Sequence, residues 1–129
     1  MTERIRIIDQ GIVLLDLSNI REPQKEAHLT DAARKLIARQ PVGEALVLTD
    51  ITGSSFSDAA VDALTKLAER NRPFVKASAL VGLSPLTRVI FRAVTALTRR
   101  DIRAFGTRDE AIVYLLSQRA EDVPPLPST

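Results

Sequence analysis

Short apolar runs alternate with amphipathic segments along most of the chain, and this alternation constrains the fold more than any other feature. Residues 12–17, 45–48 and 74–81 are dense apolar runs of strand length, as expected of strands buried on both faces of a sheet. A weaker run at residues 4–9 and a short one at 102–105 complete the expected strands. Helical spacing of apolar residues predicts helices over residues 22–40, 58–71, 84–99 and 107–119.

These elements follow the order β-β-α-β-α-β-α-β-α, which predicts an α/β fold with four helices. Gln10-Gly11 separates the first two runs and predicts a hairpin, so the first strand should be an antiparallel edge strand. Each later strand follows a helix, and such crossovers produce a mostly parallel sheet. We expect one domain over residues 1–119 and a disordered, Pro-rich tail over residues 120–129.

Composition excludes several classes of function. The 129-residue chain is 45% hydrophobic, and its formal net charge of +2 gives no support for a nucleic-acid partner. Because it has no cysteine and a single histidine, His28, thiol catalysis, disulfides and multi-histidine metal sites are excluded, and we expect no metal or cofactor. The N-terminus lacks the apolar core of a signal peptide, and no stretch approaches the roughly 18 apolar residues that span a bilayer. The expected location is therefore cytoplasmic.

Four segments follow one another in an order that is similar to a known group of small α/β proteins. They are residues 12–17, 48–53, 76–82 and 105–115. With these segments the chain resembles the STAS/SEC14-like family of small bacterial proteins, which includes anti-sigma-factor antagonists. The resemblance covers residues 4–118. It implies a STAS-like fold and a non-catalytic regulatory or protein-interaction domain; its SEC14-like side implies, as the alternative, a carrier of a lipid-like, nucleotide or other anionic ligand.

One position departs from the pattern of that family. Its antagonists begin the second helix with a segment Phe-x-Asp-Ser-Ser-Gly-Leu, whose second serine is the site of regulatory phosphorylation. Phe56 and Asp58 match this segment, whereas Ala59 and Ala60 stand where the two serines would be. Alanine has no hydroxyl to phosphorylate, so the usual phosphorylation switch cannot operate at Ala60. A contact with a partner that does not depend on phosphate remains open.

Polar residues gather where the parallel strands are expected to end. In open α/β sheets, ligands bind beyond the carboxyl ends of the strands, where three helix N-termini should also meet. Their unpaired N–H groups could hold a phosphate or carboxylate, although ordinary capping explains the same residue types. The candidate ligand- or partner-binding residues are Thr49, Asp50, Thr52, Gly53, Ser54, Ser55, Ser57, Asp58, Gly82, Ser84 and Thr107.

Two further surfaces are candidates for an interface. Arg88, Arg92 and Arg99 fall on the side of the expected third helix opposite its core stripe. They could form a patch for an acidic partner, an anionic lipid or RNA, or they could be a solvated face. Phe91 and Tyr114 lie off the core stripes of their helices. They could belong to a homodimer interface with Leu83 and Leu86 or to a hydrophobic ligand groove, or they could be single exposed apolar residues, which are common on protein surfaces.

An enzyme is the least supported class. No serine or acid is arranged around His28 in a recognisable catalytic order. Asp50 and Asp58 could act as paired carboxylates or as a weak magnesium site, but their spacing does not require it. The sequence therefore favours docking of an unidentified protein partner by the loop at residues 49–58 and the helix that follows.

Overall fold

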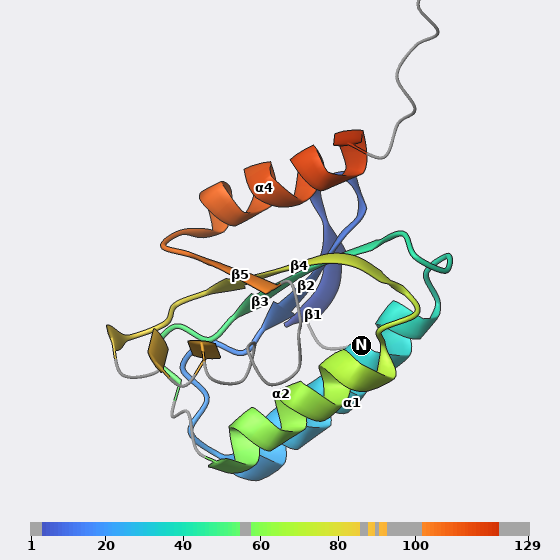
Figure 1. The fold of residues 1–129 in the computed structure, drawn as a ribbon. Coiled ribbons are helices and arrows are strands. Elements are labelled where there is room, and N and C mark those ends of the chain that lie inside the picture. Colours follow the sequence, from blue (N-terminus) through green and yellow to red (C-terminus); the bar gives the residue numbers. More distant parts are fainter. Residues whose placement is uncertain (1–3, 55–57, 86–87, 90, 93–101, 122–129) are drawn as a thin grey trace, which may run out of the picture.

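The computed structural model describes residues 4–54, 58–85, 88–89, 91–92 and 102–121. In the described part of the chain, a five-stranded sheet is covered by helices on both faces (Figure 1). The strands are β1 (Ile5–Ile8), β2 (Ile12–Asp16), β3 (Ala45–Asp50), β4 (Val75–Val81) and β5 (Ile102–Phe105). The helices are α1 (Pro23–Ala38), α2 (Asp58–Arg70) and α4 (Arg108–Glu121), and a short 3-10 turn, η1 (Asp9–Gly11), joins β1 to β2.

The order of the strands in space follows their order in the sequence. β1 pairs with β2 in antiparallel fashion, and β2, β3, β4 and β5 pair successively in parallel. This confirms the predicted α/β class and the mostly parallel sheet with an antiparallel edge strand. The parallel arrangement also brings the carboxyl ends of β2, β3, β4 and β5 to the same edge of the sheet.

Two expected segments lie partly outside the described residues. Of the predicted third helix, Pro85, Arg88, Val89, Phe91 and Arg92 are helical, and the remainder is not described, so the full set of four helices stays a prediction. α4 extends to Glu121, two residues past the expected end of the domain at residue 119. The rest of the predicted tail lies outside the described part of the chain.

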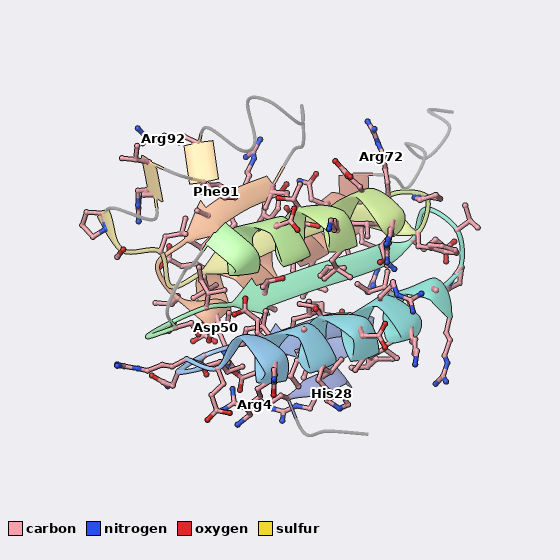
Figure 2. All side chains as sticks on the ribbon, turned by 90° about the horizontal axis from the view of Figure 1, so that it is seen from below. Arg4, His28, Asp50, Arg72, Phe91 and Arg92 are labelled. Atoms are coloured by element: carbon pink, nitrogen blue, oxygen red, sulfur yellow. The ribbon has the colours of Figure 1, made fainter. Side chains whose placement is uncertain are left out.

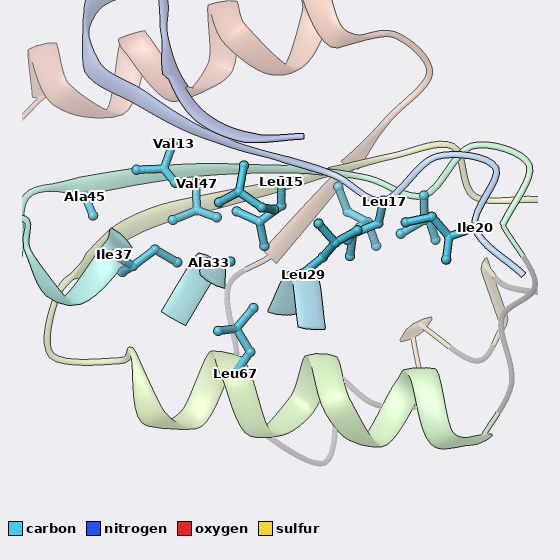
Figure 3. Packing of buried hydrophobic residues seen from close by; sticks show 13 residues of the cluster. Val13, Leu15, Leu17, Ile20, Leu29, Ala33, Ile37, Ala45, Val47 and Leu67 are labelled. Atoms are coloured by element: carbon cyan, nitrogen blue, oxygen red, sulfur yellow. The ribbon is translucent and has the colours of Figure 1, made fainter. Parts of the chain in front are cut away.

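Alternate side chains of the buried strands enter two separate cores. In β2, Val13 and Leu15 face α1 and α2, whereas Ile12 and Leu14 face α4, and all four are fully buried. This double burial explains why the central strands are continuous apolar runs. Figure 3 shows the first core, where Leu29, Ala33 and Ile37 of α1 and Leu67 of α2 pack beneath the sheet.

α1 and α2 form one helical layer. They run side by side in the same direction because each follows a parallel strand (Figures 1 and 2). Pro23 occupies the first turn of α1, where a missing N–H costs nothing. At the far end of the layer, the buried Asn71 donates from Nδ2 to the carbonyl of Arg34 at 3.1 Å and so ties the end of α2 to α1.

Candidate functional site

Two neighbouring parallel strands end in aspartates that lie opposite each other. Asp16 is the last residue of β2 and Asp50 the last of β3, and the strand register pairs them. Arg108, the first residue of α4, contacts both: its Nε donates to Asp50 Oδ2 at 2.7 Å, and its Nη2 lies 3.3 Å from Asp16 Oδ1. We call these three side chains the strand-end cluster. One guanidinium group thereby joins β2, β3 and α4.

The backbone after each aspartate folds back onto its carboxylate. Asp16 Oδ1 accepts the N–H of Ser18 at 3.1 Å. Asp50 Oδ1 accepts both the N–H and the hydroxyl of Thr52, at 2.9 Å and 2.6 Å. Such local bonds are typical of aspartate at the start of a turn. Together with the contacts of Arg108, these local hydrogen bonds satisfy both carboxylates with donors of the protein itself.

Arg4 holds the loop after β2 from the other side. Its Nη1 donates to the carbonyl of Ser18 at 2.8 Å and to that of Asp16 at 3.2 Å. The same nitrogen lies 3.8 Å from Asp16 Oδ1. Asp16 is therefore flanked by two arginines, one from each end of the domain.

Main-chain hydrogen bonds continue the sheet beyond its strands. They are Leu17 N–H to Asp50 O at 2.8 Å, Asn19 N–H to Thr52 O at 2.8 Å and Ile51 N–H to Val81 O at 2.9 Å. Ser54 adds a side-chain link, because its hydroxyl donates to the carbonyl of Leu17 and accepts the N–H of Ile20 at 3.1 Å. The loops after β2, β3 and β4 are therefore fixed to one another.

These fixed loops leave a small exposed surface. Asn19, Thr52 and Gly53 are exposed there, and the chain continues from them to Asp58, the first residue of α2. We call the three exposed residues the strand-end surface. Figure 2 shows the neighbouring Asp50 at the end of the molecule where α1 and α2 begin. The surface thus lies at the edge of the sheet where the sequence predicted that a ligand or partner binds.

The contacts of the strand-end cluster shift the pKa values of Asp16 and Arg108. Burial raises the pKa of Asp16, but the hydrogen bonds from Ser18 and the positive charges of Arg108 and Arg4 outweigh it, so the net pKa lies below its ordinary value. Burial opposes the charge of Arg108 as well, but Asp50 and Asp16 raise its pKa overall. Both shifts favour the charged forms of Asp16 and Arg108, so their contact stabilises the folded state.

Asp16→Asn is expected to lower the free energy of unfolding by about 1–2 kcal/mol at pH 7, because the amide loses charge-assisted hydrogen bonds. Since the pKa of Asp16 is lower in the folded state, its contribution is complete above the unfolded pKa and disappears as the pH falls through the folded pKa. Urea unfolding at pH 7 and pH 3 should therefore show a difference that shrinks in acid. An equal difference at both values would contradict this, and Asp62→Asn, on an exposed ion pair, serves as the control.

The predicted site residues divide into four groups. Asp50, Thr52, Gly53 and Ser54 come together at the strand ends, as expected, and Thr49 lies just before them in β3. Thr107 is the helix cap that its spacing predicts, because its Oγ1 accepts the N–H of Glu110 at 3.2 Å. Gly82 follows β4, and Ser84 is exposed at the start of the expected third helix. Ser55 and Ser57 lie outside the described residues, as does the side chain of Asp58.

The residues predicted for a dimer interface take part in core packing. Leu83 and Phe91 are half-buried and pack against the core beneath α1 and α2. Tyr114 packs on the opposite face of the sheet, where its ring centroid lies 5.2 Å from that of Phe105 and the Arg103 guanidinium lies over it. Leu86 is outside the described residues. The three described side chains therefore do not form one exposed patch, and a homodimer stays a prediction.

The remaining candidates stay separate from the strand-end cluster. Arg88 and Arg92 are exposed, and Arg99 lies outside the described residues. His28 is exposed on α1, as Figure 2 shows. Within the described ranges, no group of three or more histidine, aspartate or glutamate side chains is placed to hold a metal ion.

Sequence reasoning did not include Asp16, Arg108 or Arg4 in the site. A signal for Asp16 was present, because Asp16-Leu17-Ser18 and Asp50-Ile51-Thr52 are both an aspartate, an aliphatic residue and a hydroxyl residue at a strand end. Arg108 gave no such signal, since it is 58 residues from Asp50 in the chain.

Comparisons of the chain with protein-family models, with curated proteins and with solved structures found no match. The resemblance to the STAS/SEC14-like family therefore stays a prediction from the sequence. In the described part of the chain, no helix combines the length and apolar character that crossing a membrane requires.

Proposed function

We propose that this chain is a STAS-like, non-catalytic protein-interaction domain that docks a partner on its strand-end surface. One observation carries the proposal: non-covalent contacts hold the loops after β2, β3 and β4 together beneath that surface. These contacts are the ion pairs of Arg108 with Asp16 and Asp50 and the main-chain hydrogen bonds between the loops. A surface that is already ordered loses little conformational entropy when a partner binds. Asn19, Thr52 and Gly53 are exposed on it and available for contact.

The same cluster favours docking over capture of a small anion. Arg108 lies at the strand ends, and two carboxylates of the chain already contact it. An incoming phosphate or carboxylate would have to displace one of them, and Asp50 is only 5% exposed. Leaving a buried carboxylate without its partner is costly. A small-ligand carrier thus receives less support than an interaction domain.

The proposal does not require the phosphorylation switch of the antagonists that the chain resembles. Ala60 offers no hydroxyl, so affinity for the partner would not depend on a phosphate at this position. The partner and its pathway are to be identified by experiment.

Affinity capture with Asp58→Arg tests the surface. The substitution reverses a charge at the start of α2, and we expect it to abolish capture of a partner that the unchanged domain retains. Asp109→Arg is the matched control, because it places the same charge in the first turn of α4 and has a similar unfavourable effect on the helix dipole. Equal capture by both variants, or loss of capture with both, would contradict docking at the strand-end surface.

A further inference from the structure

A groove lies between α1 and α2, on the side of the helical layer that faces away from the sheet. Its volume is about 200 Å³, and Figure 2 shows the two helices that form its walls. The lining residues are Ala27, Thr30, Asp31, Arg34, Lys66, Leu67 and Arg70. None of them belongs to the strand-end surface, so the groove is a separate feature.

The groove has a floor that is largely buried and a rim that is mostly basic. Thr30 and Leu67 form the floor, with exposed fractions of 8% and 9%. Three cations, one carboxylate and Ala27 line the rest. An apolar and hydroxyl floor below a basic rim suits a segment that carries both apolar and acidic side chains.

The cations of the rim differ in whether they already form an ion pair within the protein. Arg34 lies 2.9 Å from Asp31, and Lys66 lies 3.0 Å from Asp62 in an exposed i,i+4 pair. Exposed pairs of this kind contribute little and exchange readily with other partners. Within the described part of the chain, no ion pair or hydrogen bond engages the side chain of Arg70. The rim therefore keeps positive charge for an incoming carboxylate.

Charges of both signs surround the groove. Lys25, Lys35, Arg39 and Arg72 are exposed on or beside the same two helices, and so are Glu22, Asp62 and Glu69. The positive charge that would attract an acidic partner is therefore local to the groove itself, where three cations face one carboxylate.

We propose that the groove between α1 and α2 docks an acidic, amphipathic segment of a protein partner. Apolar side chains of that segment would contact Leu67 and Ala27, and its carboxylates would pair with Arg70 and Lys66. A membrane surface fits less well, because the exposed large hydrophobic residues of the described structure all lie outside α1 and α2 and none could insert from this layer. This interaction goes beyond the proposed role of the strand-end surface.

Fluorescence anisotropy with a synthetic peptide tests the groove. The probe is a fluorescein-labelled helical peptide with leucine and glutamate on one face, and a second peptide has glutamine in place of each glutamate. We expect saturable binding of the acidic peptide and at least about tenfold weaker binding of the glutamine peptide, with the difference reduced by salt. Arg70→Glu should weaken binding of the acidic peptide by a similar factor.

Arg39→Glu is the matched control. Arg39 caps α1 and Arg70 lies in the last turn of α2, so both substitutions disturb a helix C-terminus in the same way, but only Arg70 lines the groove. We expect Arg39→Glu to change affinity less than about twofold, and circular dichroism verifies that each variant is folded. Equal weakening by both variants, or equal binding of both peptides, would overturn the proposal.

Two further measurements separate this proposal from its alternatives. If the protein sediments with phosphatidylserine vesicles and does not bind the acidic peptide, the proposal is overturned in favour of a lipid surface. Asp58→Arg, at the opposite end of α2 from Arg70, should leave peptide affinity unchanged. Retained peptide binding by this variant would support the groove even if the strand-end surface captures no partner.

Discussion

Arg108→Met lowers the free energy of unfolding by about 2–3 kcal/mol at pH 7 if the strand-end cluster stabilises the domain as its contacts indicate. The substitution keeps much of the aliphatic volume but leaves Asp16 and Asp50 facing each other without the shared cation. Breaking a buried ion pair on one side costs about 3–5 kcal/mol. We expect less here because the Arg108 side chain is 36% exposed and is partly screened by water.

A double substitution isolates the electrostatic cause of that loss. Asp50→Asn in the Arg108→Met background removes one of the two carboxylate charges that face each other and should recover at least about 1 kcal/mol, as measured by urea unfolding. Arg119→Met is the control on the same helix, because Arg119 donates to the carbonyl of Gln10 at an exposed site and its loss should cost less than about 1 kcal/mol. A double variant no more stable than Arg108→Met would contradict the account.

Gly82→Ala is expected to lower the free energy of unfolding by about 2–4 kcal/mol. Gly82 has φ +96°, where an L side chain is strained. A Cβ atom at this position would also collide with the backbone nitrogen of Thr52, which belongs to the neighbouring loop of the strand-end surface. Backbone atoms cannot yield as a flexible side chain would, so the loop after β3 must move.

Gly43→Ala separates strain from collision. Gly43 has φ +74°, but nothing lies within 4 Å of a Cβ atom built there, so this variant carries the backbone penalty alone, about 1 kcal/mol. Hydrogen exchange should show faster exchange at Ile51 in Gly82→Ala but not in Gly43→Ala, since the Ile51 N–H donates to Val81 O beside Gly82. Equal losses of stability and unchanged exchange in both variants would refute the collision.

Much of the fold follows from local pattern. The apolar runs of β2, β3 and β4 predict strands covered on both faces, and α1 with α2 on one side and α4 on the other supply that cover. The cap of α4 was also visible, because Thr107 and Glu110 have the spacing that such a cap requires. These features depend on residues that are close in sequence or on simple periodicity.

Of the three residues in the strand-end cluster, only Asp50 was predicted from the sequence, and the reason is physical. Asp50 stands out because it follows a buried strand and precedes a polar loop. Its partner Arg108 becomes adjacent only when β5 returns the chain to the sheet and α4 begins at the same edge. That contact depends on how the fold brings distant segments together, and sequence periodicity does not report such contacts. Tyr114 shows the same limit, since its off-stripe position is explained by Phe105 and Arg103 of β5.

Site-specific photo-crosslinking in cells tests the central claim, docking at the strand-end surface, most directly. A photoreactive residue at exposed Thr52 should yield one specific adduct that Asp58→Arg abolishes and Asp109→Arg preserves. The same residue at Val113, which is 69% exposed on α4, should not yield that adduct. The absence of any adduct from Thr52, or the same adduct from Val113, would contradict the claim.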